Sequence, residues 1–185
     1  MLKWHFLRPI VVSLAAAMAV QLAACSPPAF KSVDITGANY AHDFSLESAS
    51  GGQRSLADFR GKLVVVFFGF TQCPDVCPTT LADLAEVKKR LGAAGDQLQV
   101  VFITIDPERD TADVLRQYVA AFDPGFVALR GSAEQTAATA KEFKIFYQKV
   151  PGSTPTSYTM DHTAGGYVFD KQGRVRLSMK AVDTE

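Results

Sequence analysis

Two apolar runs stand out in the pattern of hydrophobic and polar positions along the chain. Residues 63–70 read LVVVFFGF, and residues 98–105 read LQVVFITI. Both runs are rich in β-branched and aromatic residues, and both have the length of a strand. A strand that is apolar on both faces lies in the middle of a sheet. The pattern therefore predicts two central strands.

Helical periodicity fills the segments that follow these runs. From Leu81 onward, apolar residues recur at spacings of three and four, and Gly92 can end that helix. Asp110 is expected to cap a second helix, and Ser132 opens the capping-box pattern Ser-Ala-Glu-Gln of a third. The expected helices cover residues 81–91, 110–119 and 132–143. Helical crossovers between buried strands indicate a parallel core sheet.

Shorter elements flank this core. Phe44 and Leu46 alternate with polar neighbours before Gly51 and Gly52, which predicts an N-terminal hairpin. Further strands are expected at residues 126–129, 145–147 (an edge strand), 166–169 and 174–177, the last two forming a closing hairpin. The order of elements predicts an α/β fold with a central mixed sheet flanked by helices. It is compatible with a thioredoxin-like layout.

Composition and charge agree with one globular domain. The 185 residues are 48% hydrophobic and 21% charged, which argues against a disordered chain and a membrane protein of many spans. Lys and Arg together number 19, as do Asp and Glu, so no basic excess exists to neutralise phosphates. The charge therefore argues against a dedicated nucleic-acid binder.

The beginning of the chain has the order of a secretory signal peptide. Lys3 and Arg8 precede an apolar stretch shorter than the roughly 20 residues that cross a bilayer. The stretch ends at Leu-Ala-Ala-Cys25, which resembles a bacterial lipobox, in which the cysteine is lipidated. We expect a signal peptide at residues 1–24, a lipidated tether at residues 25–40 and a folded domain at residues 41–185. The mature protein would be an exported lipoprotein, facing the periplasm or the cell exterior.

Export changes the count of charges and thiols. Removal of residues 1–24 leaves 17 basic residues against 19 acidic ones, and lipidation of Cys25 leaves only Cys73 and Cys77 as free thiols. In an oxidising compartment, such a pair is a structural bridge, a redox pair or a set of metal ligands.

The two cysteines lie directly after the first predicted central strand. In open α/β sheets, sites form beyond the carboxyl ends of the strands. Pro78 suits the first position of the following helix, which would make Cys77 its N-cap and lower the pKa of that thiol. The spacing Cys-x-x-x-Cys leaves room for an ion between the sulfurs. Two soft thiolates suit Cu(I), Zn(II) or disulfide chemistry.

A third ligand would come from one of the two histidines of the expected mature chain. His42 lies in the N-terminal hairpin, whereas His162 lies in a long polar loop before the strand at residues 166–169. That strand should return beside the centre of the sheet and bring its leading loop to the edge where the cysteines lie. We therefore predict His162 as a ligand, with Asp161 orienting the imidazole or its neighbours. Met160 is a packing residue or a thioether ligand.

Three ordered motifs resemble those of the Sco/SenC copper chaperones. They are FFGFTQCPDVCPTTL at residues 67–81, DPERDT at residues 106–111, and DHTA at residues 161–164 followed by YVFD at residues 167–170. The resemblance covers about residues 44–177. It implies a thioredoxin-like fold and copper, as Cu(I), Cu(II) or both, bound by Cys73, Cys77 and His162.

The resemblance also implies a role in maturing the dinuclear copper site of cytochrome c oxidase, by copper delivery or by thiol reduction. The copper-bearing subunit of the oxidase would be the partner, together with another periplasmic copper chaperone or a thiol reductase. The family's domain usually closes with a C-terminal helix, for which residues 178–185 are too few and too polar. We therefore expect either a shortened chain or a less covered sheet face.

Three other functions use the same residues. A peroxiredoxin carries a threonine three residues before its reactive cysteine, and that position before Cys77 is Pro74. A plain thiol–disulfide oxidoreductase would use Cys73 and Cys77 as a redox pair and would not need His162. A closed zinc site requires a fourth ligand, which the sequence does not identify. A metal carrier rather than an enzyme is therefore the expected class.

Overall fold

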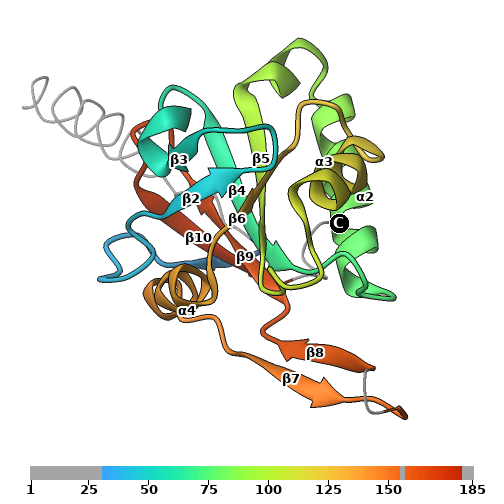
Figure 1. Cartoon of the computed structure of the whole chain (residues 1–185). Helices are drawn as coiled ribbons and strands as arrows, with labels where there is room; N and C mark the ends of the chain where they lie inside the picture. Colours follow the sequence, from blue (N-terminus) through green and yellow to red (C-terminus); the bar gives the residue numbers. More distant parts are fainter. Residues whose placement is uncertain (1–30, 155–156, 181–185) are drawn as a thin grey trace, which may run out of the picture. The chain divides into compact units, whose positions relative to one another are not determined.

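The computed structural model describes residues 31–154 and 157–180. Their centre is an eight-stranded mixed sheet with the order β1-β10-β9-β4-β5-β6-β2-β3 (Figure 1). The strands are β1 Val33–Asp34, β2 Ser45–Ser48, β3 Gln53–Ser55, β4 Leu63–Gly69, β5 Leu98–Thr104, β6 Val127–Arg130, β9 Gly165–Phe169 and β10 Val175–Lys180. β4, β5 and β6 run parallel to one another, and β9 and β2 flank them antiparallel.

The two predicted central strands lie side by side in the middle of this sheet. Leu63 of β4 is opposite Leu98 of β5, and Gly69 is opposite Thr104. Every residue of β5 is buried, as is every residue of β4 except Leu63. Because the two strands are parallel, they end at the same edge of the sheet. The cysteine loop and the loop of residues 105–111 therefore leave the sheet next to each other.

Helices cover both faces of the sheet, as predicted. The α-helices are α2 Val76–Arg90, α3 Ala112–Ala120 and α4 Ala133–Glu142, and the 3-10 helices are η2 Leu56–Phe59 and η3 Gly92–Gln97. Successive residues of a strand point to opposite faces. Val66 packs in the apolar cluster that contains Phe143, which directly follows α4. Phe67 packs in the other cluster, with Leu81 of α2 and Leu115 of α3.

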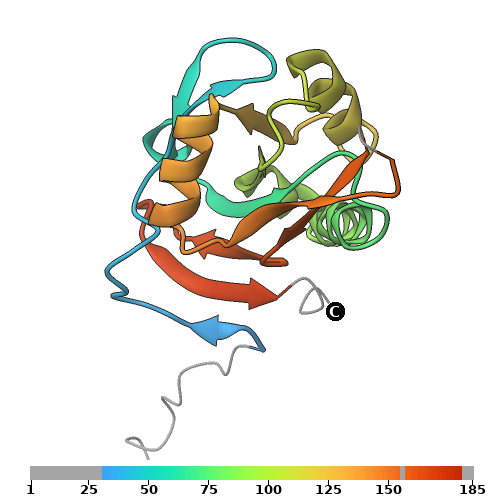
Figure 2. The same ribbon diagram turned by 60° about the horizontal axis from the view of Figure 1, so that its bottom comes forward.

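Both predicted hairpins are present, one toward each edge of the sheet. In the N-terminal hairpin, β2 pairs with β3 and also with β6. In the closing hairpin, β10 pairs with β9 and, on its other side, with β1 (Figure 2, red and blue). β1 lies within residues 25–40, for which the sequence predicted a tether.

Two predicted helix starts are wrong. Helix α2 begins at Val76 with Asp75 at the N-cap, so Cys77 lies inside the first turn instead of capping the helix. Proline is tolerated throughout a first turn, because amides there have no intrahelical acceptor. Thr111, not Asp110, caps α3, and its side-chain oxygen accepts a hydrogen bond from the amide of Val114. The carboxylate of Asp110 has other partners, inside the protein.

The segment between α4 and β9 differs most from the prediction. Strands β7 Tyr147–Pro151 and β8 Tyr158–His162 pair with each other and form a separate two-stranded sheet (Figure 1). The edge strand predicted at residues 145–147 and the loop predicted around His162 are therefore wrong. Ile145 is buried in the core, and His162 is the last residue of β8.

No helix among the described residues has the length and hydropathy needed to cross a membrane. The expected signal peptide and Cys25 lie outside the described residues.

Candidate metal centre

The two cysteines flank the start of α2. Cys73 lies in the loop between β4 and α2 and is partly exposed, whereas Cys77 is fully buried. The backbone amide of Cys77 donates a hydrogen bond to the sulfur of Cys73, with an N–S distance of 3.4 Å. The amide of Cys73 in turn donates to the carbonyl oxygen of Phe70. The loop thus folds back on itself, and both sulfurs face the same region.

Gly69, the last residue of β4, explains how the Cys77 sulfur fits. A β-carbon at Gly69 would lie 2.7 Å from that sulfur and 2.9 Å from a ring carbon of Phe102. Distances this short are below any normal contact, so only glycine leaves room for the sulfur beside the strand. The glycine of the first motif therefore serves the position of Cys77.

His162 approaches the cysteines from the β7–β8 hairpin. It is the last residue of β8 and lies opposite Tyr147 in the strand pairing. A ring nitrogen of His162 and the sulfurs of Cys73 and Cys77 all lie within 4.8 Å of one another. No other group of three potential metal ligands of this kind was found among residues 31–154 and 157–180. The structure thus brings together the three residues that the sequence singled out.

The ring of His162 has a defined orientation. Its Nδ1 lies 3.0 Å from the carbonyl oxygen of Thr163. Since a carbonyl oxygen only accepts hydrogen bonds, Nδ1 carries the proton and Nε2 keeps its lone pair for a ligand. Burial lowers the pKa of His162, and this effect outweighs the opposing influence of the Thr163 carbonyl and the charge of Asp161. A neutral imidazole is the form that binds metals.

The environment of Cys77 contradicts one prediction. Burial raises the pKa of the Cys77 thiol, and the nearby Cys73 raises it further. The predicted lowering assumed that Cys77 is the N-cap of the helix, but Cys77 lies inside the first turn and its sulfur is enclosed beside Gly69 and Phe102. A metal cation supplies the positive charge that such an enclosed thiolate lacks.

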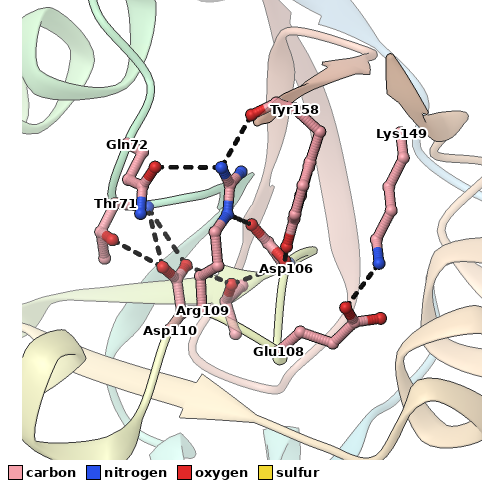
Figure 3. A network of polar contacts seen from close by, with 9 residues as sticks. Thr71, Gln72, Asp106, Glu108, Arg109, Asp110, Lys149 and Tyr158 are labelled. Carbon is pink, nitrogen blue, oxygen red and sulfur yellow. Dashed lines mark hydrogen bonds and ion pairs between the residues drawn. The ribbon is translucent and has the colours of Figure 1, made fainter. Parts of the chain in front are cut away.

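The second motif fixes the cysteine loop through Asp110, which is fully buried. Its carboxylate accepts hydrogen bonds from the amide and hydroxyl of Thr71, at 3.1 and 2.6 Å, and from the hydroxyl of Thr104 (Figure 3). Burial raises the pKa of Asp110, although these hydrogen bonds oppose the rise. Thr71 lies two residues before Cys73, so the carboxylate holds the loop at the end of β5.

Arg109 of the same motif contacts three separate segments. Its Nε donates to the carboxylate of Asp106, and its Nη1 donates to the side-chain oxygen of Gln72 at 3.0 Å and to the carbonyl oxygen of Tyr158 at 2.8 Å. The guanidinium carbon lies 3.6 Å from the centre of the Tyr158 ring. The Tyr158 hydroxyl donates to Asp106 at 2.9 Å, which closes the network (Figure 3). Sequence reasoning recognised the motif but did not assign Arg109 a role.

The other candidates of the sequence have different roles. His42 pairs with Glu142 at 2.8 Å and is not part of the three-residue group. Met160 is buried in the apolar core, as a packing residue. Asp161 is exposed, and the imidazole of His162 is held by the Thr163 carbonyl instead of by Asp161.

Together, an α/β sheet with helices on both faces and a Cys-Cys-His group at the ends of its parallel strands define a thioredoxin-like protein with a site for a soft metal. The chain belongs to the SCO1/SenC family, whose model matches residues 33–185.

Known proteins of this family resemble the chain in sequence and fold. The mouse mitochondrial SCO2 homologue is 41% identical over 133 residues, which are 71% of this chain and 52% of that protein. The chain thus spans about half the length of this curated relative. The structure of Bradyrhizobium japonicum ScoI with copper bound is 36% identical, with a TM-score of 0.70 over 76% of this chain and 88% of that one. Apo Sco1 from Thermus thermophilus is 39% identical, with a TM-score of 0.74 over 86% of this chain and 92% of that one.

Proposed function

We propose that this protein binds one copper ion through Cys73, Cys77 and His162. The observation that carries the proposal is the convergence of the three ligand atoms within 4.8 Å. Two thiolates and one imidazole are soft and borderline donors, which suit Cu(I), while the imidazole also accommodates Cu(II). Similarity to a Bradyrhizobium protein solved with copper supports the choice of metal.

The bound copper serves the maturation of the dinuclear copper site of cytochrome c oxidase. Membership of the SCO1/SenC family and the three motifs that resemble its members support this role. The copper-bearing subunit of the oxidase is the proposed recipient, and a periplasmic copper chaperone or a thiol reductase is the proposed upstream partner. A site with three ligands leaves copper open to an incoming ligand of the recipient, which favours transfer over permanent retention.

The proposed location is the outer side of a membrane, where a lipid on Cys25 anchors the domain. Residues 1–24 act as the signal peptide, and the residues between Cys25 and strand β1 connect the lipid to the folded domain. The support is the order of basic residues, apolar stretch and lipobox-like sequence. Mass spectrometry of the membrane-extracted protein should find an acylated cysteine at the N-terminus, and an intact Met1 would contradict this proposal.

A specific observation also favours thiol reduction at the same site. Cys73 is partly exposed, and the buried Cys77 is its neighbour. The Cys73 thiolate can attack a disulfide of the partner and form a mixed disulfide, which releases one partner thiol. Cys77 then attacks Cys73, so the partner gains both thiols and the pair becomes a Cys73–Cys77 disulfide. Membership of the SCO1/SenC family favours this alternative over a peroxiredoxin-like antioxidant.

Anaerobic Cu(I) titration of the full chain in detergent tests the proposed function. With both thiols reduced, we expect one Cu(I) per chain. With the pair oxidised to a disulfide, we expect no high-affinity binding, and reduction should restore it, because the same sulfurs cannot be both bridged and coordinated. Undiminished binding by the bridged form would place the copper site elsewhere and contradict the proposal.

A further inference from the structure

We infer that Arg109 is a positioning residue that holds the histidine-bearing strand β8 against the cysteine loop. This inference rests on the proposed copper site and adds a residue to it. Arg109 does not belong to the three-residue ligand group; it acts through the segments that carry those ligands.

The geometry of the guanidinium shows which segments it joins. One nitrogen, Nη1, donates both to Gln72, the residue before Cys73, and to the backbone carbonyl of Tyr158, the first residue of β8. Nε donates to Asp106, which is 1% exposed and lies two residues after the end of β5. The cysteine loop, the β5–α3 loop and the histidine hairpin thus meet at one side chain (Figure 3).

Two contacts of the Phe70 ring extend the same attachment to the other end of β8. The guanidinium carbon of Arg109 lies 5.9 Å from the centre of the Phe70 ring. The Phe70 ring is 5.9 Å from the ring of His162, with an angle of 82° between the planes. Arg109 therefore contacts the first residue of β8 directly and the last residue through Phe70.

Apart from the hydrogen bond from the Tyr158 hydroxyl to Asp106, the remaining attachments of β8 do not fix its position as firmly. Met160 buries its side chain in the core, but methionine is flexible and adapts to small shifts. Lys149 of β7 pairs with Glu108 and lies 4.8 Å from the centre of the Tyr158 ring. Both Lys149 and Glu108 are exposed, and such contacts contribute little at exposed sites. The planar guanidinium of Arg109 has two aromatic rings and three oxygen acceptors around it. It therefore fixes both the orientation of β8 and its distance from the cysteine loop.

The test compares variants of the full chain in detergent. Arg109→Met keeps the aliphatic part of the side chain and removes the charge and the donors. Lys149→Met is the matched control, because it removes an ion pair between the same hairpin and the same loop. His162→Ala and the double variant Arg109→Met/His162→Ala complete the set.

The first measurement is hydrogen–deuterium exchange of the metal-free protein. In Arg109→Met, the amides of residues 158–162 should exchange at least about tenfold faster, while those of β4 and α2 keep the wild-type rates. Lys149→Met should match the wild type. Unchanged exchange in β8, or faster exchange throughout the sheet, would overturn the inference.

The second measurement is copper affinity by chelator competition. Arg109→Met should lose about 10–100-fold in Cu(II) affinity and less than about threefold in Cu(I) affinity, because the two thiolates still hold Cu(I). The double variant should bind Cu(II) no more weakly than His162→Ala alone, since both changes remove the same ligand. Equal losses for Cu(I) and Cu(II), or a double variant with additive losses, would show a general structural role and overturn the inference.

A further variant guards against misfolding. If Arg109→Met does not fold, Arg109→Lys keeps the charge but cannot reach Asp106 and Tyr158 at once, so its Cu(II) affinity should lie between those of the wild type and His162→Ala. A wild-type Cu(II) affinity in Arg109→Lys would overturn the inference. If the wild type binds no copper, the proposed function fails, and the exchange experiment still decides the role of Arg109.

Discussion

The two halves of the candidate copper site are built in different ways. The cysteine half belongs to the core: Cys77 is fully buried, Gly69 makes room for its sulfur, and Asp110 holds the loop from inside the protein. The histidine half lies on a hairpin that forms its own two-stranded sheet and is attached by Met160, Arg109 and a few surface contacts. The difference teaches that Cys77 is fixed by packing and the loop of Cys73 by a buried carboxylate, whereas His162 is held through the contacts of a separate hairpin.

This comparison assigns different tasks to the two halves. A rigid thiolate pair sets the affinity for Cu(I), because two soft ligands suffice for that ion. An imidazole on a separately attached hairpin can join or leave as copper changes oxidation state or passes to a recipient. Variants in each half should therefore affect the two oxidation states differently.

The largest effect is expected from the cysteine half. Cys77→Ser and Cys73→Ser should each lower Cu(I) affinity by more than about 100-fold, because one ligand of such a site is worth on the order of 3 kcal/mol. Chelator competition measures both. A Cu(I) affinity within tenfold of the wild type in either variant would remove that residue from the ligand set.

The next effect is expected from the histidine half. His162→Ala should lower Cu(II) affinity by about 10–100-fold and Cu(I) affinity much less, since the imidazole matters more for Cu(II). His42→Ala is the matched control, because His42 pairs with Glu142 outside the ligand group. If His42→Ala has the larger effect on Cu(II), the third ligand has been assigned to the wrong histidine.

A third prediction concerns the packing that supports Cys77. Gly69→Ala should lower the free energy of unfolding by about 1–3 kcal/mol, because the new methyl group overlaps the Cys77 sulfur and the Phe102 ring. The change should also weaken Cu(I) binding, because the sulfur must move. Urea denaturation measures the stability, and a wild-type midpoint would show that the strand shifts without resistance.

The smallest effect concerns the pH dependence of stability at Asp110. Burial raises the pKa of this carboxyl in the folded protein, so the unfolded chain releases its proton at lower pH than the folded protein does. The raised pKa therefore adds to the free energy of unfolding below the ordinary aspartate range. This contribution is lost as the pH rises through the pKa of Asp110 in the folded protein. Relative to Asp110→Asn, the wild type should lose free energy of unfolding across that window.

Denaturant unfolding at a series of pH values measures this difference. A wild type that gains stability over the same window relative to Asp110→Asn would show that the hydrogen bonds from Thr71 and Thr104 outweigh burial. That result would show that the folded protein stabilises the charged carboxylate of Asp110 through these hydrogen bonds.

The core was predictable from the sequence because its signals are local. The runs around Val66 and Phe102 identified β4 and β5, and the capping box at Ser132 identified the start of α4. The motif residues Cys73 and Cys77 followed from their place after a buried strand. Hydrophobic pattern and chain order sufficed for these elements.

The periphery was less predictable, for physical reasons. In β8, Met160 is the only fully buried residue, and one buried position among polar neighbours gives no clear period-two pattern. The start of α2 was misplaced because Asp75 and Pro78 are both compatible with a helix N-terminus. Arg109 donates hydrogen bonds to Gln72 and Tyr158, which are 37 and 49 positions away in the sequence. No local sequence pattern indicates contacts between residues so far apart.

The attachment of the hairpin also bears on the order in which the chain assembles. β4, α2 and β5 are consecutive in sequence, so their closure requires shorter loops than the return of β8, which follows only after α3, β6 and α4. Shorter loops close at lower entropic cost and form earlier in folding. We therefore expect the contacts around the cysteine pair to form before the histidine hairpin docks. During that interval the two thiols are most exposed to oxidation or to a foreign metal, so the speed of the last docking step protects the newly made protein.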